Sequence, residues 1–378
     1  MLEKIPITNE QNQDFYIQKE KLEEIKRELE EFCASTLFST NKSFPNEILF
    51  THELKSNNAI EGYYEDLSSI IKITNNPYLH NDMLDKEFRR ILNLYNGYKY
   101  ILEHKDITKS SLNELYKILS YNLLDEDQLL KGLYRHSDVY IFFSDNMEIE
   151  PDKGFEVKNI LPHMDELFEY INQGNDISEV ELFFKSQIIH FYMVFIHPYF
   201  DINGRTARTT SLWFLNSNES YPYTIFNRAI TYNKRDYYKY IRDVRRHRNI
   251  TPFVKSIAEN TKLELEKEYV IRCIEENSGT SLTPLDKQIL QYILENNSQS
   301  TLIDIQTFYN RFNPRVKLKY LDEELMQPIF EKGILLKKGT SKKGIYEGNF
   351  NYKFSFNPKN LDFDKSKIKR LSIDKLYR

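Results

Sequence analysis

The stretch VELFFKSQIIHFYMVFI spans Val180 to Ile196, and HPYFDINGR follows it at residues 197–205. The first of these segments is apolar on nearly every side, which is typical of a helix buried in the middle of a helical bundle. Its most apolar part, Ile188–Ile196, contains His190 and has about half of the roughly 20 residues that a bilayer requires. We therefore expect a core helix here, and not a membrane span.

Helical periodicity surrounds this segment on both sides, with apolar residues spaced three and four apart among charges. One interruption has a different period. VYIFF (Val139–Phe143) and MEIE (Met147–Glu150) flank the turn-forming residues 144–146, which predicts a short β-hairpin. Helices are expected at Phe15–Ala34, Asn46–Lys55, Met83–Glu103, Leu112–Asn122, Val157–Asn172, Arg205–Asn216 and Lys234–Arg245, with a long helix or a pair of helices after Ile250. The fold class is thus mainly all-α.

A second, smaller unit is indicated at the C-terminal end, after the linker-like fragment Asn277–Ser281. Helices are expected at Pro284–Glu295, Leu302–Phe312 and Val316–Glu331, and GILLKKGTSKKGIYEG (333–348) then predicts two short strands around a turn. Three helices and a two-stranded wing are the pattern of a winged helix-turn-helix domain. We divide the chain into an N-terminal helical region at 1–110, a catalytic core at 111–275, a winged-helix domain at 283–350 and a C-terminal tail at 351–378.

The composition agrees with a folded chain of two unequal domains. The chain has 378 residues and a mass of 45.4 kDa, 40% of its residues are hydrophobic, and its mean hydropathy is -0.61. The formal net charge of -4 excludes a global basic field, so any contact with nucleic acid must be local. Cys33 and Cys273 form no metal or disulfide pattern, and the N-terminus lacks the basic start and apolar run of a signal peptide. We expect a cytoplasmic protein without membrane contact.

The segment after the core helix contains a candidate general base. Pro198 disfavours helical backbone at His197, so we expect the imidazole just past the helix end, facing a loop. Asn203-Gly204 supplies a tight turn, and the helix that restarts beyond it offers first-turn N–H groups without intrahelical partners. Such a helix N-terminus is a potential anion site.

Charged residues complete this segment. Arg205 and Arg208 stand three apart, hence on one face of the first turn, where both can reach a polyphosphate. Asp201 can hold Mg²⁺ bound to the same phosphates, because hard oxygen ligands suit this ion. Taken singly, His197 could be a helix-end residue, Asp201 an N-cap, and the arginines partners of surface carboxylates. Their combination within twelve residues favours a nucleotide-transfer site.

This run resembles the signature of the Fic family, His-Pro-Phe-x-Asp/Glu-Gly-Asn-Gly-Arg-x-x-Arg. GLYR at 132–135, the predicted hairpin and ITPFV at 250–254 extend the resemblance to about residues 40–265. Two positions depart from the signature. Tyr199 replaces the Phe and keeps an aromatic anchor, whereas Ile202 replaces the first Gly, where a β-branched residue would strain a positive φ. The matching positions are His197, Pro198, Asp201, Asn203, Gly204, Arg205 and Arg208.

The resemblance implies a Fic-type helical bundle with a β-hairpin flap and the activity of a protein adenylyltransferase (AMPylator). His197 would take the proton of a target Ser, Thr or Tyr hydroxyl, which attacks the α-phosphate of ATP, so that AMP is transferred and pyrophosphate leaves. Asp201 would hold Mg²⁺, and the hairpin at 139–150 would bind the target protein as an added strand. Gly204 stands where a phosphorylating branch of the family has Lys, which favours AMP transfer. The phosphates would be bound by Asn203, Gly204, Arg205 and Arg208.

A second motif lies upstream, in Asn57-Asn58-Ala59-Ile60-Glu61-Gly62. It resembles the family's inhibitory helix pattern Ser/Thr-x-x-x-Glu-Gly/Asn, with Asn57 where Ser or Thr is expected. The resemblance implies that Glu61 pairs with Arg208 and blocks productive placement of the γ-phosphate, which makes Glu61 an autoinhibitory switch. The alternative is an ordinary helix C-terminus with a solvated Glu.

Two other functions are compatible with the sequence. One is a DNA-binding, nucleotide-sensing regulator with a weakened Fic core, because nine Lys or Arg stand against four acids between Arg311 and Lys343. The acids Asp322–Glu324 fall within the candidate recognition helix, however, so the winged helix would equally suit a protein partner. The other function is removal of AMP from a modified protein, with Glu61 orienting a water. A homodimer is compatible as well.

Overall fold

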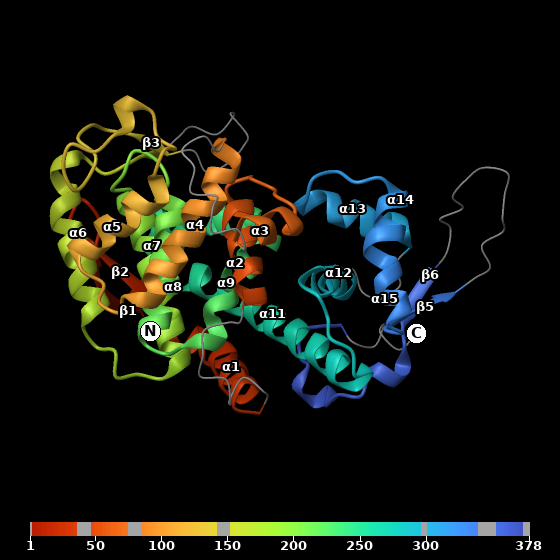
Figure 1. The fold of residues 1–378 in the computed structure, drawn as a ribbon. Helices are drawn as coiled ribbons and strands as arrows, with labels where there is room; N and C mark the ends of the chain where they lie inside the picture. Colours follow the sequence, from red (N-terminus) through yellow and green to blue (C-terminus); the bar gives the residue numbers. More distant parts are fainter. Residues whose placement is uncertain are drawn as a thin grey trace.

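The computed structural model describes residues 2–35, 47–74, 85–141, 152–295, 301–338 and 353–372, without the side chains of residues 47–50 and 312. The chain is mainly helical, as the sequence predicted, and three two-stranded antiparallel sheets complete its described part (Figure 1). A large helical body holds the residues before about 280, and a smaller C-terminal unit lies beside it (Figure 1).

The core helix of the large body is α7 (Glu179–Ile196), and its residues from Leu182 to Ile196 are all buried. Helices α6 (Val157–Asn172) and α8 (Asn203–Ser217) pack on it, and α4 (Lys86–Glu103) and α5 (Lys109–Ser120) pack on α8. The apolar character of α7 on every side is therefore explained by neighbours within the protein. Among the described residues, no helix combines the length and apolarity needed to cross a bilayer.

Local sequence signals set both ends of α7. At its start, the Ser178 hydroxyl accepts from the backbone N–H of Glu181, and the Glu181 carboxylate accepts from the backbone N–H of Ser178, which forms a capping box. At its end, Pro198 follows the first non-helical residue, His197. The position of His197 at the mouth of the next loop thus follows from residues beside it in the sequence.

The N-terminus forms a β-hairpin where the sequence predicted the start of a helix. Strand β1 (Glu3–Thr8) pairs with β2 (Asp14–Ile17), and Ile5 lies opposite Phe15. The helix predicted over Phe15–Ala34 begins only with α1 (Glu23–Ser35). Buried and more exposed side chains alternate along both strands, and this period of two, which belongs to a strand, outweighed the helical spacing at Tyr16.

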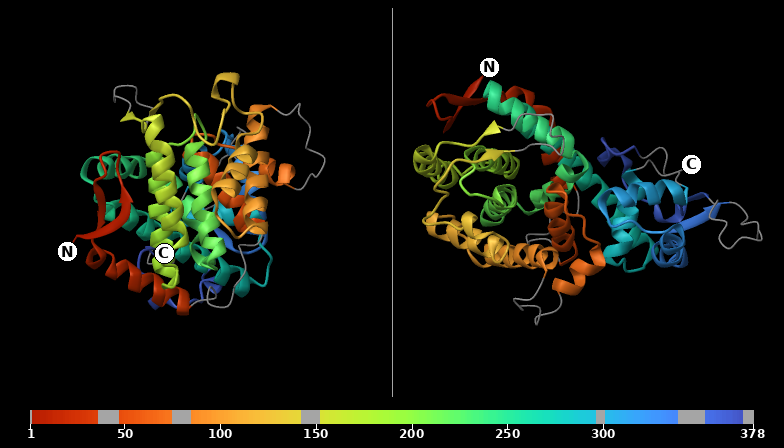
Figure 2. Two further views of the ribbon diagram at one scale, coloured as in Figure 1. Left: turned by 90° about the vertical axis from the view of Figure 1, so that its left-hand side faces the viewer. Right: turned by 90° about the horizontal axis from the view of Figure 1, so that it is seen from above.

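Helix α2 (Glu47–Ile60) lies between the large body and the C-terminal unit (Figures 1 and 2). It packs on α9 (Phe226–Tyr232) and α4, and its side chains from Thr51 to Ile60 are all buried. Helix α3 (Leu67–Thr74) follows it and contacts the C-terminal unit. Because α2 has no face left to solvent over these residues, its position depends on packing from both sides.

The long helix α11 (Thr251–Ser278) joins the two parts of the chain, and Gly279, with φ 63°, ends it. The sequence left open one helix or two in this region, and the structure has one. A 3₁₀ turn at Tyr221–Ile225 and α10 (Lys234–His247) complete the large body before it.

The C-terminal unit consists of helical segments followed by a two-stranded sheet. Strand β5 (Leu335–Lys338) pairs with β6 (Lys353–Phe356), a strand that the sequence analysis did not predict. The stretch 344–348, where we expected the second strand, lies outside the described residues. The third predicted helix is divided into α- and π-helical parts. The helical segments are α12 (Pro284–Glu295), α13 (Leu302–Phe312), α14 (Leu318–Tyr320), a π-helical turn (Leu321–Met326) and α15 (Gln327–Glu331).

The segment predicted as a C-terminal tail at 351–378 is folded over its described part. Strand β6 belongs to the sheet just described, so the boundary at 350 was placed too early. Further on, backbone N–H groups of Lys369, Arg370 and Leu371 donate to the buried carboxylate of Glu266 at 3.0, 2.9 and 2.7 Å. These bonds hold residues 369–371 on α11, which the Lys-rich composition did not indicate.

A short antiparallel pair of strands lies near residue 140, where the sequence predicted a β-hairpin. Strand β3 (Tyr140–Ile141) pairs with β4 (Asp152–Lys153), and Tyr140 lies opposite Lys153. The predicted second strand, Met147–Glu150, lies outside the described residues. An ion pair between Lys153 and Asp138 at 3.0 Å joins the two sides of the hairpin.

Candidate active site

His197 caps the C-terminal end of α7 in the left-handed conformation, with φ 54° and ψ 62°. Its backbone N–H donates to Met193 O at 3.1 Å, and its ring Nδ1 lies 3.4 Å from Val194 O. A contact of the ring with a carbonyl places the proton on Nδ1, which leaves Nε2 as the free, basic nitrogen. The half-buried imidazole is thus held by the helix end in one orientation.

Burial lowers the pKa of His197 to about 4, and the positive charges of Arg135 and Arg245 act in the same direction. The contact with Val194 O and the charge of Glu61 oppose this shift. The ring is therefore neutral near pH 7 and able to accept a proton. A general base at this position would be available without prior deprotonation.

Arg135 holds the loop that contains His197. Its Nε donates to His197 O and its backbone N–H to Pro198 O, both at 2.9 Å. Its guanidinium also donates to Ser137 O at 2.8 Å and to Phe155 O, on either side of the β3–β4 hairpin. One buried side chain thus fixes the candidate base relative to the flap.

Asn203 closes the loop between α7 and α8. Its Oδ1 accepts from the Tyr199 N–H and its Nδ2 donates to Tyr199 O, each at 2.9 Å. Tyr199 itself is buried and stacks on Tyr116, with ring centroids 3.7 Å apart. The Asn203 side chain, which we expected to bind phosphate, is therefore occupied within the loop, and only its backbone N–H remains for a ligand.

Ile202 has φ 66° and ψ 11°, the left-handed conformation that the Gly of the signature would adopt freely. A β-branched residue at this φ costs roughly 1–2 kcal/mol. The side chain is 3% exposed, and the Ile202 carbonyl accepts the first helical bonds of α8 from the N–H and hydroxyl of Thr206. The loop thus has the backbone form expected of the signature, and packing of Ile202 offsets its strain.

The first turn of α8 contains several N–H donors without a hydrogen-bond partner in the helix. Because the first backbone bond of the helix is that of Thr206, the N–H groups of Asn203, Gly204 and Arg205 have no intrahelical partner. Arg205 is buried, and its Nε is without a partner, which makes it an orphaned donor beside these groups. The turn and the guanidinium together form a site for an anion.

Glu61 occupies this anion site with its own carboxylate. Its Oε1 accepts from Nη2 of the buried Arg208 at 2.5 Å, and a Cβ added to Gly204 would overlap the same oxygen. Although burial disfavours its charged form, the charges of Arg208 and Arg205 hold the pKa of Glu61 below its usual value. Glu61 is therefore ionised, and its side chain is 29% exposed, in contrast with the solvated Glu of the alternative interpretation.

Asn57 and Gly62 position Glu61, at the end of α2, toward Arg208. Asn57 Oδ1 accepts from Arg208 Nε at 2.8 Å, and Asn57 O accepts from Arg208 Nη2 at 3.2 Å. Gly62, with φ 89°, ends the helix so that Glu61 directly follows its last turn. Asn57 thus fills the place of the expected Ser or Thr with a contact to the arginine itself.

Asp201 is exposed and lies just before α8. One oxygen accepts from the Ile202 N–H at 2.6 Å, and its charge acts on Arg205. Among the described residues, no group of three or more His, Cys, Asp or Glu side chains could hold a metal by themselves. A single carboxylate beside an anion site nevertheless fits Mg²⁺, which in nucleotide sites takes one or two carboxylates plus phosphate oxygens.

The structure thus brings together all the predicted residues: His197, Asp201, Asn203, Gly204, Arg205, Arg208 and Glu61. Sequence analysis missed the roles of Arg135, Asn57 and Tyr63. Tyr63 lies between two guanidinium groups, 3.8 Å from Arg90 and 5.8 Å from Arg205 to its ring centroid. GLYR was noted only as part of a resemblance, and no local pattern marked Tyr63, because its partners are distant in the sequence.

Part of this sequence and the fold of the chain are similar to known proteins. Residues 106–215 match the model of the Fic/DOC family. A crystal structure of a Fic family protein from Desulfovibrio desulfuricans G20 superposes with a TM-score of 0.55 at 15% identity, over 89% of this chain and 95% of that one. Fic-1 (residues 134–508) from C. elegans superposes with a TM-score of 0.50 at 16% identity, over 67% of this chain and 72% of that one. At these identities the structures show a shared fold.

Proposed function

We propose that this chain, which carries a Fic/DOC family domain, transfers AMP from ATP to a Ser, Thr or Tyr hydroxyl of a target protein and that Glu61 inhibits the transfer. Fic domains include AMPylators and other transferases, so the domain alone supports only group transfer. The observation that carries the proposal is the anion site at the first turn of α8, where Arg205 and Arg208 meet unpaired N–H groups beside His197. A triphosphate is the substrate group that this site suits.

The side chains divide the work as follows. His197 accepts the proton of the target hydroxyl as its oxygen attacks the α-phosphorus. The bond from that phosphorus to the bridging oxygen breaks, and pyrophosphate leaves with the electron pair. Arg205, Arg208 and the first N–H groups of α8 stabilise the negative charge of the phosphates. Asp201 would hold Mg²⁺, which would neutralise further phosphate charge.

Glu61 inhibits by competition for the same cations. Its carboxylate already neutralises Arg208, and its oxygen lies against Gly204, where a phosphate oxygen needs room. A nucleotide whose phosphates reach Arg208 must displace this carboxylate. The proposed substrate protein binds along the edge of the β3–β4 hairpin, where Tyr140 is 65% exposed.

The test is the intact mass of the Glu61→Gly protein after incubation with Mg²⁺ and ATP, beside wild type and a Glu61→Gly/His197→Ala double variant. It requires no known target, because self-modification reports the chemistry. We expect whole AMP additions in Glu61→Gly alone. Phosphate-sized additions would replace AMP transfer by phosphorylation, and three unmodified proteins would contradict both transfer and inhibition.

The same assay tests AMP removal. AMP-modified Glu61→Gly protein is freed of ATP and incubated with Mg²⁺ and fresh wild-type or His197→Ala protein. A stable modification agrees with transfer as the activity of the chain. Loss of AMP with the wild type only would assign removal to this site, with Glu61 and His197 as the groups that activate water.

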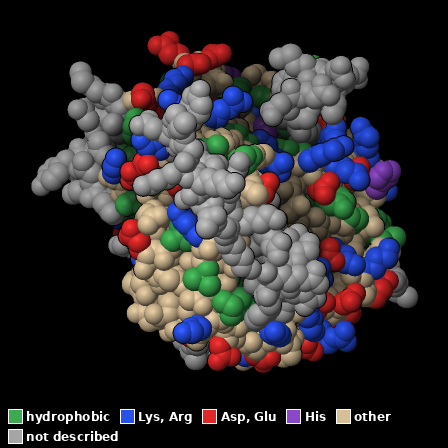
Figure 3. All heavy atoms as spheres, turned by 90° about the vertical axis from the view of Figure 1, so that its right-hand side faces the viewer, with side chains coloured by type: hydrophobic (Ala, Val, Ile, Leu, Met, Phe, Trp, Pro, Cys, Tyr) green, Lys and Arg blue, Asp and Glu red, His purple; other side chains and the backbone are tan. Residues whose placement is uncertain are grey.

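A second candidate function is DNA binding by the C-terminal unit. It rests on four exposed cations at the end of α13, in the connection that follows and in α14: Arg311, Arg315, Lys317 and Lys319. Figure 3, which faces this unit, shows acidic side chains interspersed with Lys and Arg, so a continuous basic surface is not visible there. Salt-sensitive binding of a DNA duplex that persists in His197→Ala, without AMP transfer in the mass assay, would favour this function.

A further inference from the structure

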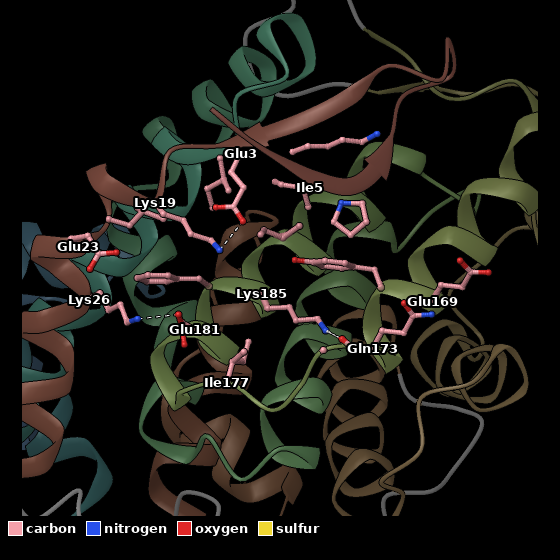
Figure 4. Close-up of a pocket in the computed structure, with 18 residues that line it drawn as sticks. Glu3, Ile5, Lys19, Glu23, Lys26, Glu169, Gln173, Ile177, Glu181 and Lys185 are labelled. Carbon is pink, nitrogen blue, oxygen red and sulfur yellow. Dashed lines mark hydrogen bonds and ion pairs between the residues drawn. The ribbon is translucent and has the colours of Figure 1, made fainter. Parts of the chain in front are cut away.

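A cavity lies beneath the N-terminal β-hairpin, away from the candidate active site (Figure 4). Its volume is about 480 Å³, within the range of about 300–1,000 Å³ that is usual for small-molecule sites. The hairpin, the start of α1, the C-terminal end of α6 and the N-terminal half of α7 form its walls. Lys185 lines this cavity and precedes His197 by twelve residues on α7. At 1.5 Å per residue, the cavity and the candidate base are therefore about 18 Å apart along the helix.

The interior of this cavity is largely apolar. Ile5 and Ile17 line it from the hairpin, Tyr170 from α6, and Phe184 and Ile188 from α7. Ile177, in the connection between α6 and α7, also lines it and is 40% exposed. Large apolar side chains around an accessible volume favour a ligand with an apolar body.

Lys185 places a positive charge in this apolar wall. The residue is 6% exposed, and its ammonium donates to Gln173 O and, at 2.5 Å, to Asn175 Oδ1. Its Nζ lies 4.9 Å from the centroid of the Tyr170 ring. The same Nζ lies 5.4 Å from the centroid of the Phe214 ring, so two aromatic faces are near the ammonium. Both hydrogen-bond acceptors are neutral, so no formal negative charge balances the ammonium.

No carboxylate compensates Lys185 within the described part of the chain, where its ammonium forms no ion pair. Burial alone lowers its pKa, to about 8, so the ammonium form still predominates near neutrality. A buried cation without a counter-charge is costly, and an anionic ligand would remove that cost.

Two other lysines of the cavity are paired with glutamates at its rim. Lys19 pairs with Glu3 at 2.8 Å, and Lys26 pairs with Glu181 at 2.9 Å (Figure 4). Further rim glutamates add negative charge, which opposes a ligand with two or more negative charges. The charge pattern therefore suits one negative charge, located at the inner end of the ligand.

We propose that this cavity binds an organic acid that has a single carboxylate and an unbranched or aromatic apolar body. The carboxylate accepts from Lys185, and the apolar body lies against Ile5, Tyr170 and Phe184. The inference does not depend on AMP transfer, because no residue of the candidate active site lines the cavity.

Isothermal titration calorimetry of the full chain with sodium decanoate tests this proposal. Decyltrimethylammonium, which has the same chain length and the opposite charge, is the comparison ligand. We expect one decanoate per chain and at least about tenfold weaker binding of the cation. No heat of binding up to about 1 mM decanoate, or equal affinity for both ligands, would overturn the proposal.

Two variants locate the ligand. Ile177→Trp fills part of the cavity and is expected to lower decanoate affinity at least about tenfold. Leu161→Trp, on α6 outside the cavity and 50% exposed against 40% for Ile177, should leave the affinity unchanged. Lys185→Met should lower decanoate affinity about tenfold and bring it to that of the cation. Should Lys185→Met unfold the α6–α7 connection, Ile177→Trp decides, and unaltered binding in that variant contradicts the site.

Discussion

The ammonium of Lys55 on α2 donates to Asn313 Oδ1 at 2.6 Å, which joins the helix that ends at Glu61 to the C-cap of α13 in the C-terminal unit. The same ammonium donates to Glu65 O, and Asn313 Nδ2 donates to the Tyr292 hydroxyl at 2.9 Å. Nearby, Tyr232 of α9 stacks on Phe308 of α13, with ring centroids 6.0 Å apart. The C-terminal unit thus contacts both α2 and its packing partner α9.

Asn313→Ala should loosen α2 and raise self-modification of the otherwise wild-type chain. Removal of Asn313 leaves the buried Lys55 ammonium with one acceptor fewer, a loss of about 1–3 kcal/mol, part of which appears as displacement of Glu61. We expect the rate of AMP incorporation to rise about three- to tenfold, as measured by intact mass over time. Asn310→Ala is the matched control, because within the described part of the chain the Asn310 side chain accepts from the Val316 N–H of the same unit.

Unchanged modification in Asn313→Ala, alongside increased modification in Glu61→Gly, would show that the C-terminal unit does not hold the inhibitory position. Absence of modification in Glu61→Gly as well would instead contradict the proposed transfer. The two failures are therefore distinguishable in one series of samples.

Gly204→Ala should destabilise the folded protein only when Glu61 is present. Its new Cβ would overlap Glu61 Oε1 and lie 3.0 Å from Arg208 Nη1, an overpacking that costs about 1–3 kcal/mol. In the Glu61→Gly background the overlap with Oε1 is gone, and the remaining close contact is with the end of the Arg208 side chain, which can move by a few tenths of an ångström. Ala then improves helix propensity by up to about 1 kcal/mol. Urea unfolding of the four proteins measures this coupling, and additive effects would place the Glu61 carboxylate elsewhere.

His197 should remain neutral at pH values where an ordinary imidazole is protonated. Its pKa is lowered to about 4 in the folded chain, against about 6.5 when unfolded. The unfolded state therefore binds the proton first as pH falls, so the stability from this residue is complete above pH 6.5 and is lost toward pH 4. Carbon-detected NMR of labelled histidines, assigned with His197→Gln, reports the titration, and a midpoint near 6.5 contradicts the prediction.

Asn203→Ala should destabilise the loop before α8 more than a comparable change at the other end of that helix. It leaves the N–H and carbonyl of the buried Tyr199 unpaired, at a cost of about 2–4 kcal/mol. Asn218→Ala removes one bond, to Phe214 O, from a half-buried residue and should cost less than about 1 kcal/mol. Equal losses in thermal unfolding would remove the structural role assigned to Asn203.

Local sequence predicted those parts of the fold that depend on neighbours along the chain. The apolar run before Pro198 predicted both α7 and the position of His197 past its end, because periodicity and helix-stop signals act within a few residues. The prediction of a helix from Phe15 onward was wrong, because the apolar residues there fit both a strand and a helix period. Pairing with β1 makes this segment a strand. Local sequence also did not predict β6, whose partner β5 is separated from it by residues 339–352.

In the candidate active site, too, some features follow from the local sequence and others from tertiary contacts. The sequence by itself determined which residues follow α7 and that cations flank the start of α8, because spacing on a helix is fixed by its geometry. The motif at residues 57–62 implied through its resemblance that Glu61 pairs with Arg208, but the geometry of that contact across 147 residues comes from the tertiary structure. Only the tertiary structure decided that the Asn203 side chain turns inward to Tyr199 and that Lys185 lies in a cavity wall without a counter-charge. These contacts join elements far apart in the chain, and their geometry depends on how whole helices pack, which no local pattern encodes.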